Sequence, residues 1–111
     1  MINLLKRLLG IEDRTFGVAR SGGWSTFRKN FITGKVCAVC ARHDKLEVHH
    51  IIPFWQDPSQ ELNPLNCTVL CQGLGTRNDH LYFGHLGKWA SWNVNVIKDS
   101  VEWNNKIKTR P

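Results

Sequence analysis

The segment Leu46 to Phe54, LEVHHIIPF, has the pattern of a short β-strand. Its aliphatic positions flank two histidines, and Pro53 ends the strand because proline has no N–H to donate to a neighbouring strand. A second run, NCTVL at residues 66–70 with Cys71 closing it, predicts another strand that pairs antiparallel with the first. A loop rich in proline, asparagine and aspartate, residues 55–66, connects the two.

Aromatic residues with the spacing of one helix face occur at Trp24, Phe27 and Phe31. Ser21 is a candidate cap for the start of this helix, and Gly34 is a candidate for its end. We expect the aromatic face to pack in the core.

Further helices are predicted in the last third of the chain. After a glycine-containing loop, HLYFGHLGKW begins a short helix near Asp79 or His80. Asn93 is a good cap for a final helix over about residues 94–108. The apolar side of that helix is supplied by Ile97, Val101, Trp103 and Ile107. Two strands among these helices give an α+β fold class.

The N-terminal segment differs in character from the rest. Residues 2–9 place aliphatic side chains at helical spacing beside Lys6 and Arg7, which predicts a short amphipathic helix that packs on the domain or binds a partner. Residues 10–23 contain four glycines and are typical of a loop or linker. We therefore separate an N-terminal segment and linker, residues 1–19, from a domain over residues 20–111.

Cysteine use depends on the compartment, and we expect a cytoplasmic one. The apolar N-terminal run is interrupted by charge and lacks a cleavage site, and no run approaches the length of a membrane span. In a reducing compartment, four cysteines indicate a metal site more than disulfides.

Positive charge indicates the kind of partner. The chain has 15 lysine and arginine residues against 9 aspartate and glutamate residues, a net charge of +6, which favours nucleic acid or another polyanion. Candidate phosphate contacts are Arg28 and Lys29 on the polar side of the aromatic helix, and Lys106 and Lys108 at the end of the last helix. Plain solvation is the ordinary alternative for such charges.

Cys37 and Cys40 form a CxxC motif, VCAVC. Two thiolates at this spacing can hold one Zn²⁺ in a tight turn. A redox CxxC is the rival interpretation, but it normally sits at a helix start in a βαβ unit, which this sequence does not predict.

His49 and His50 lie in the middle of the first predicted strand. Side chains alternate along a strand, so the two rings should start on opposite faces, and a twist or bulge near Pro53 would swing both toward one edge. One imidazole free for a metal and one free for a proton is what metal-assisted hydrolysis needs. For an isolated pair, one packed and one solvated histidine is the ordinary alternative.

The order of the motifs is more specific than any one of them. CxxC is followed by LEVHHIIPF, then NPLNCTVLC, then a loop and NDHLYFGH. In this order the chain resembles the HNH endonuclease family, the ββα-metal or His-Me finger nucleases, over about residues 20–111. It is most similar to small phage and bacterial members, through PFWQDPSQELNPLN and GHLGKWASWNVNVIKDSVEW.

The resemblance implies a ββα-metal finger with a short antiparallel hairpin, flanking helices and a structural zinc site. It implies that His50 is the general base that deprotonates the attacking water, and that Asn66 holds the hairpin and orients this base. His49 and His80 match the ligands of the catalytic divalent ion, which would be Mg²⁺, Mn²⁺, Ni²⁺ or Zn²⁺. His85 has a looser match, as a further ligand or a phosphate contact.

The zinc frame departs from the family pattern. Many members carry a second CxxC just before the final histidine, whereas here a longer loop follows Cys71 and Asp79 stands in the place of the fourth cysteine. The firm ligands are Cys37, Cys40 and Cys71. The fourth ligand is Asp79, or it is Cys67, or the site holds no metal; the ordinary alternative for Cys67 is a small core residue.

These features predict a metal-dependent endonuclease that cuts DNA with weak sequence selectivity, because scattered lysine and arginine contact phosphates rather than base edges. Two other functions fit the same residues. One is a zinc-stabilised DNA-binding module without catalysis. The other is an accessory protein of a phage packaging or DNA-processing complex that contacts its partner through residues 2–9.

Overall fold

The computed structural model describes residues 20–73 and 77–109. In chain order the elements are α2 (Trp24–Ile32), β1 (Leu46–His50), η1 (Pro58–Gln60), η2 (Pro64–Asn66), β2 (Cys67–Cys71), η3 (His80–Gly84) and α3 (Val96–Lys108). The predicted α+β class is confirmed. None of the helices in the described ranges is both long enough and apolar enough to cross a membrane. The predicted helix over residues 2–9 lies outside these ranges, and the division of the chain at residue 19 stays a prediction.

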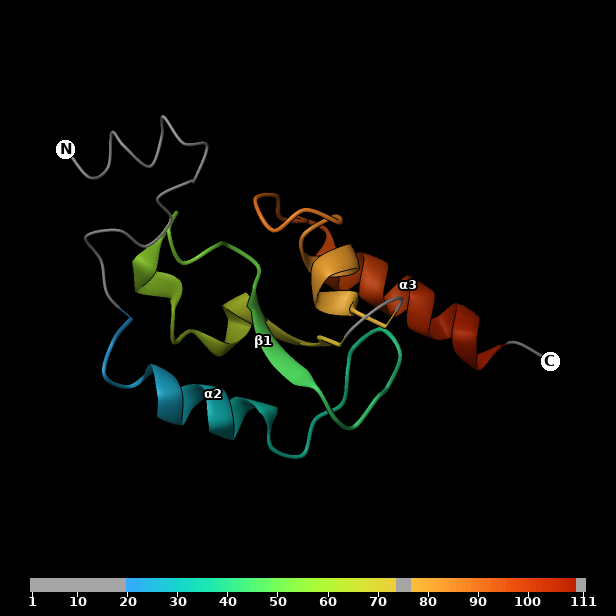
Figure 1. Cartoon of the computed structure of the whole chain (residues 1–111), viewed down its shortest axis with the longest axis horizontal. Coiled ribbons are helices and arrows are strands. Elements are labelled where there is room, and N and C mark those ends of the chain that lie inside the picture. Colours follow the sequence, from blue (N-terminus) through green and yellow to red (C-terminus); the bar gives the residue numbers. More distant parts are fainter. Residues whose placement is uncertain (1–19, 74–76, 110–111) are drawn as a thin grey trace.

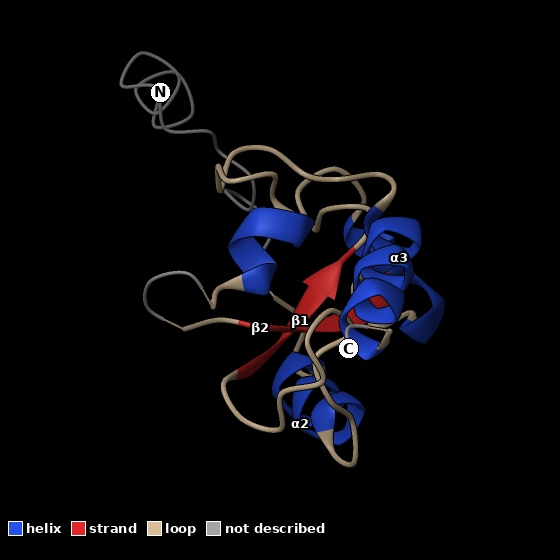
Figure 2. Ribbon diagram, turned by 90° about the vertical axis from the view of Figure 1, so that its right-hand side faces the viewer, coloured by secondary structure: helices blue, strands red, loops and turns tan. Residues whose placement is uncertain are grey.

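A two-stranded antiparallel hairpin lies at the centre of the molecule (Figure 1). β1 and β2 pair in a register that runs from Leu46 opposite Cys71 to His50 opposite Cys67. α2 packs against β1, while η3 packs against both strands and carries α3 behind it. Figure 2 shows α2 and α3 on different sides of the hairpin. The hairpin followed by a short helix agrees with the predicted finger.

β1 ends at His50, four residues before the end of the predicted strand. Beyond it, the side-chain amide of Asn66 takes the place of a partner strand. Its Oδ1 accepts a hydrogen bond from the Ile52 N–H at 2.8 Å, and its Nδ2 donates to the Ile52 carbonyl at 3.1 Å. Both backbone polar groups of one residue are thus satisfied without a ladder, so the chain can turn there.

α2 differs from its prediction in two respects. Its N-cap is Gly23, without a side-chain hydrogen bond, and Ser21 contributes only its carbonyl, which accepts from the Trp24 N–H at 3.2 Å. No residue of α2 is fully buried, so its aromatic face is a half-buried cover on the hairpin rather than part of the core. Gly34 follows the helix with φ +77°, the left-handed conformation expected after a helix end.

The buried core is small and lies between the CxxC segment, β2 and α3. Its members are Cys37, Val39, Leu70, Cys71 and Val96. Two of these five residues are cysteines from the predicted zinc frame, so the core and that frame occupy the same place. A core with so few apolar side chains gains much from a metal crosslink.

α3 packs on a different face from the predicted one. Val96 and Ser100 are buried, and Asn104, one turn further on, donates from Nδ2 to the Val39 carbonyl at 3.0 Å. The apolar residues expected to pack are between 37% and 53% exposed: Ile97, Val101, Trp103 and Ile107. The prediction was wrong because it assigned the buried side by apolar character alone, whereas an asparagine that pairs with a backbone carbonyl can occupy it.

Asn93 acts at the start of α3, although the helix begins at Val96 with Asn95 as its N-cap, later than predicted. The Asn93 Oδ1 accepts from the Asn95 N–H at 2.9 Å. Its Nδ2 donates to the Phe83 carbonyl at 3.0 Å and to the Asp99 carboxylate at 2.8 Å. Asn93 therefore ties α3 to η3.

Candidate metal centres and active-site cavity

Two groups of metal-ligating side chains lie beside η3. The three-histidine cluster is His49, His80 and His85; the cysteine cluster is Cys37, Cys40, Cys71 and Asp79. In each group, one candidate ligand atom per residue lies within 4.8 Å of all the others. The two clusters meet at consecutive residues, since Asp79 belongs to one and His80 to the other.

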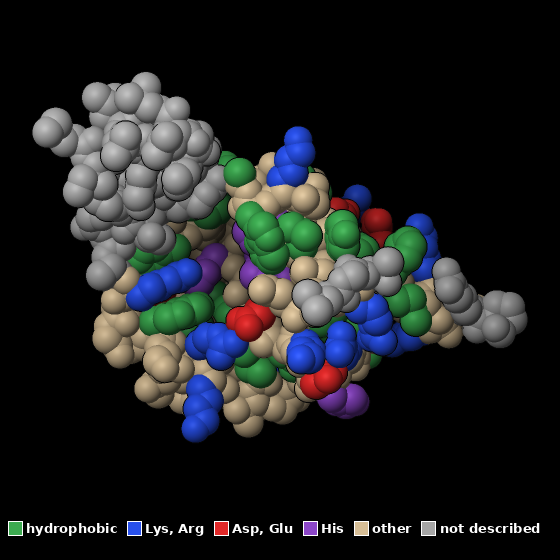
Figure 3. All heavy atoms as spheres, in the orientation of Figure 1, with side chains coloured by type: hydrophobic (Ala, Val, Ile, Leu, Met, Phe, Trp, Pro, Cys, Tyr) green, Lys and Arg blue, Asp and Glu red, His purple; other side chains and the backbone are tan. Residues whose placement is uncertain are grey.

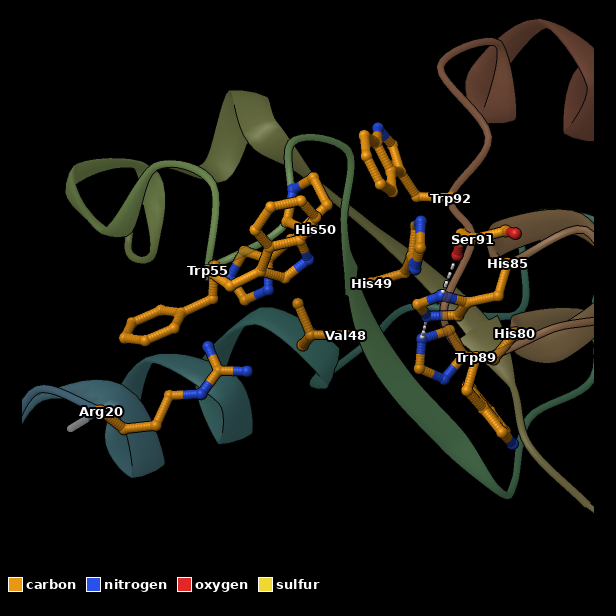
Figure 4. A pocket seen from close by; sticks show the side chains of 12 residues that line it. Arg20, Val48, His49, His50, Trp55, His80, His85, Trp89, Ser91 and Trp92 are labelled. Atoms are coloured by element: carbon orange, nitrogen blue, oxygen red, sulfur yellow. Dashed lines mark hydrogen bonds between the residues drawn. The ribbon is translucent and has the colours of Figure 1, made fainter. Parts of the chain in front are cut away.

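The rings of the three-histidine cluster form a nearly equilateral triangle (Figure 4). Their centroids are 5.1 Å apart for His49 and His80, and 4.9 Å apart for each pair that includes His85. On an α-helix, residues three or four apart share a face and a pair five apart diverges. The π-helical turn of η3, in which the His85 N–H donates to the His80 carbonyl at 3.1 Å, brings this pair together.

Hydrogen bonds fix the tautomers of the two η3 histidines. The Nδ1 of His85 lies 2.7 Å from the Ser91 carbonyl, which can only accept, so this nitrogen carries the proton. The Nδ1 of His80 lies 2.7 Å from the Gln72 Oε1 and donates in the same way. The two Nε2 atoms then carry lone pairs, yet they face each other at 3.2 Å. A divalent cation between them would satisfy both lone pairs, and support of the other ring nitrogen is the usual second shell of a histidine metal ligand.

His49 completes this cluster from β1. It is only 2% exposed, and its Nε2 is buried without a hydrogen-bond partner in the part of the chain that the structure describes. Gly84 makes room for the ring, because a Cβ there would lie 2.8 Å from the His49 Nδ1. Burial lowers the pKa of His49 to about 2, and burial, with a smaller effect of the neighbouring His85, lowers the pKa of His80 to about 3. Both rings are therefore neutral near pH 7, the form that binds metals.

His50 points to the other side of β1, as the alternation predicts. Its Nε2 donates to the Glu61 carbonyl at 2.8 Å, which leaves Nδ1 as the nitrogen that can accept a proton. Its ring lies 5.0 Å from that of Trp24. Burial lowers the pKa of His50, so the ring is neutral at pH 7. His50 nevertheless lines the same cavity as the three-histidine cluster.

Figure 3 shows histidine side chains in a hollow of the molecular surface. Arg20 also lines this cavity. Its guanidinium lies 3.4 Å from the Glu61 carboxylate, whose other oxygen accepts from the Ser21 N–H at 3.1 Å. Glu61 is 4% exposed. This buried glutamate therefore holds both Arg20 and His50.

The cysteine cluster is closed and largely buried. The Sγ atoms of Cys37 and Cys71 each lie 3.3 Å from one oxygen of Asp79, and the Sγ atoms of Cys40 and Cys71 are 3.9 Å apart. The Cys71 N–H donates to the Cys37 Sγ at 3.3 Å. Burial raises the pKa of Cys71 to about 12, so without a cation this thiol keeps its proton, whereas a bound divalent ion would deprotonate it.

Asp79, rather than Cys67, joins the three cysteines that were expected to bind zinc. Cys67 and Cys71 are the two ends of β2. Four residues of strand span about 13 Å, too far for both to bind one ion. Cys67 is only 7% exposed, which agrees with the alternative that it is a small core residue rather than a zinc ligand.

The basic residues expected to contact nucleic acid lie away from the cavity. Arg28 pairs with Glu47 at 2.7 Å, Lys29 is exposed in the last turn of α2, and Lys106 and Lys108 are in the last turn of α3. Figure 3 shows lysine and arginine in several separate places on the face drawn. Their role stays a prediction.

Residues 37–73 match the family model of the HNH endonuclease. This segment is an HNH motif. It covers about a third of the chain and includes His49, His50 and Asn66 together with the three expected zinc ligands. Searches of curated proteins and of solved structures give no match. The predicted resemblance to the HNH family is confirmed for residues 37–73.

The two clusters reach beyond the matched segment, because Asp79, His80 and His85 come after it in the chain. Sequence reasoning missed the supporting residues Glu61, Gln72 and Ser91, since Glu61 and Ser91 accept from the histidines through backbone carbonyls, which carry no sequence signal. The residues present fit two metals: a four-ligand site with thiol donors, and a three-nitrogen site that opens on a cavity.

Proposed function

We propose that this chain is a metal-dependent endonuclease that hydrolyses DNA phosphodiester bonds. The observation that carries the proposal is the pair of opposed Nε2 lone pairs on His80 and His85, with the unpartnered Nε2 of His49 in the same cluster. His49 and His80 would hold the divalent ion, with His85 as a third ligand. The ion would be Mg²⁺, Mn²⁺, Ni²⁺ or Zn²⁺, and when bound it neutralises charge that develops on the phosphate.

His50 has the properties that a general base needs. Its ring is neutral near pH 7 and its Nε2 is committed to the Glu61 carbonyl, so Nδ1 takes the proton of the attacking water. The oxygen of that water bonds to phosphorus as the bond to the leaving oxygen breaks, and the leaving oxygen takes a proton from solvent water. Asn66 fixes the turn after His50 through the two hydrogen bonds to Ile52, which keeps the base in position.

A structural Zn²⁺ belongs in the cysteine cluster under this proposal. Three thiols and a carboxylate in one buried place would repel one another if ionised, and a divalent cation removes that repulsion. DNA would be held mainly through its phosphates, with Arg28, Lys29, Lys106 and Lys108 as contacts. A cytoplasmic location, in a bacterial host if the protein is phage-encoded, and a partner bound through residues 2–9 are further parts of the proposal.

Replacement of His50 by Ala tests the proposal, and His43→Ala is its matched control because His43 is exposed and does not line the cavity. We expect His50→Ala to lower the rate of plasmid nicking by about 10²- to 10⁴-fold, the usual contribution of a general base, with DNA binding retained. His43→Ala should cleave like the wild type. Assays would use supercoiled plasmid with Mg²⁺, Mn²⁺ or Ni²⁺.

Two results would overturn the proposal in different ways. If the His50→Ala variant nicks plasmid at the wild-type rate, His50 is not part of the mechanism. DNA binding by the wild type without strand breaks in any of the metals would favour the zinc-stabilised DNA-binding module instead.

A further inference from the structure

The cavity that contains the three-histidine cluster has more aromatic surface than phosphate hydrolysis requires. Its volume is about 200 Å³, and Trp55, Trp89 and Trp92 line it beside the histidines. A phosphodiester and water are polar, and the face of an indole ring offers them little. These rings suit a different part of a nucleic acid.

The tryptophans are arranged around the histidines. The rings of Trp92 and Trp55 meet edge to face with centroids 5.2 Å apart. The Trp89 ring lies 5.2 Å from that of His80 and 4.9 Å from that of His85, and Trp89 is still 48% exposed. Figure 4 shows Trp92 and Trp89 at opposite ends of the three-histidine cluster. A polynucleotide that crosses the cluster therefore meets an indole ring on each side of the candidate metal.

We propose that Trp89 and Trp92 are stacking platforms for nucleobases and that the preferred substrate is single-stranded or locally unpaired DNA. The inference rests on the proposed nuclease function of the same cavity. In a duplex the bases stack on one another, so an indole ring beside a phosphate has no base to stack on. Unpaired bases expose a π face that aromatic side chains bind with little dependence on sequence.

The same cavity contains a guanidinium, that of Arg20, which is paired with Glu61 and has further N–H donors for the backbone between such bases. The Arg20 guanidinium lies 4.4 Å from the ring centroids of both Trp24 and Phe54. Its ion pair with Glu61 holds it at the cavity wall. Aromatic faces next to a fixed cation are the combination by which grooves bind single strands.

The test measures binding apart from cleavage. Each variant would be made in the His50→Ala background with its metal content left as purified, and gels would confirm that the oligonucleotides stay intact. Fluorescence anisotropy would compare a labelled single strand, its duplex, and an abasic strand of equal length that keeps every phosphate. The variants are Trp89→Ala and Trp92→Leu, with Trp92→Phe to restore an aromatic face. Trp103→Ala is the matched control, because Trp103 is 41% exposed but does not line this cavity.

We expect the parent to bind the single strand at least tenfold more tightly than the duplex. Trp89→Ala and Trp92→Leu should each weaken single-strand binding by about tenfold, the usual effect of losing one stacking partner, and leave binding of the abasic strand unchanged. Trp92→Phe should recover most of the loss, and Trp103→Ala should lose nothing. Equal losses on the abasic strand, or tighter binding of the duplex, would overturn the inference.

Cleavage by the wild type separates this inference from the proposed function. If the wild type cuts duplex DNA faster than single strands, the stacking role is refuted but the proposed nuclease function stands. If the wild type binds single strands as expected but cuts no DNA, the stacking role stands and the proposed nuclease function is refuted.

Discussion

The cysteine cluster and the three-histidine cluster meet at consecutive residues of the chain, but they differ in their donor atoms, their number of candidate ligands and their exposure. The cysteine cluster has four ligands, and its Cys37 and Cys71 are 1% and 0% exposed. The three-histidine cluster offers three nitrogens at the wall of a cavity. Closed four-ligand sites are usually structural, and three-ligand sites with an open position are usually catalytic. Under the proposed function, an ion in the cysteine cluster would hold η3 in place, and the three-histidine cluster would use the side chains that η3 presents.

Removal of a cysteine ligand should have the largest effect. We expect Cys71→Ala to lose the metal of the cysteine cluster and to lower the free energy of unfolding by about 4 kcal/mol or more, since small metal-dependent domains often unfold without their ion. Metal analysis and urea denaturation would measure both quantities.

Cys67→Ala is the matched control, because it removes a buried cysteine outside the cluster. It should keep the metal and cost about 1 kcal/mol. If both alanine variants lost metal equally, the assignment of Asp79 over Cys67 would be wrong.

Loss of the Gln72 acceptor should have an intermediate effect, confined to the three-histidine cluster. Gln72→Leu removes the partner of the His80 Nδ1 and should weaken Mn²⁺ or Ni²⁺ binding by about 10- to 100-fold, without change in the thermal unfolding temperature or in the metal of the cysteine cluster. Titration calorimetry would measure the affinity. Gln72→Glu, which keeps an acceptor, should bind like the wild type, and an unaltered affinity in Gln72→Leu would argue against His80 as a ligand.

Acid should lower the free energy of unfolding through His49 and His80 when no metal ion is added to the three-histidine cluster. The folded-state pKa values of His49 and His80, about 2 and about 3, lie below the unfolded value of 6.5, so the unfolded chain takes up protons first as the pH falls. The free energy of unfolding should therefore be unaffected above pH 6.5 and fall below it, by about 1.4 kcal/mol per pH unit for each histidine. Urea denaturation from pH 7 to 4 would give this slope. His80→Gln should reduce this slope by about 1.4 kcal/mol per pH unit, the contribution of one proton. An identical slope in that variant would contradict the low pKa of His80.

The hairpin could be predicted because it depends on local pattern, and the HNH motif because the order of the motifs resembles that family. The convergence of His80 with His49 followed from the resemblance, whereas His85 was only a looser match, as a further ligand or a phosphate contact. A pair five residues apart has no shared face in an α-helix, and nothing in HLYFGH announces the wider turn that η3 adopts.

The face of α3 could not be predicted for a different reason. Its pattern favours Ile97 and Val101 as buried residues, yet the helix is held by the amides of Asn93 and Asn104, each bonded to a distant backbone carbonyl. Such bonds depend on which loops lie nearby in space, and periodicity carries no information about them. Cys67 could have been excluded as a zinc ligand from the predicted strand alone. It and Cys71 are the two ends of that strand, and such ends cannot reach a common ion.

The absence of a side chain at position 84 has a consequence for sequences related to this one. Any substituent there would enter the space of the His49 ring, which is enclosed and cannot retreat. A homologue that keeps every histidine but carries alanine or a larger residue at this point would have to hold the ring that corresponds to His49 in another place. Under the proposed function, this position would distinguish homologues that can hold the ion in the same way from those that cannot.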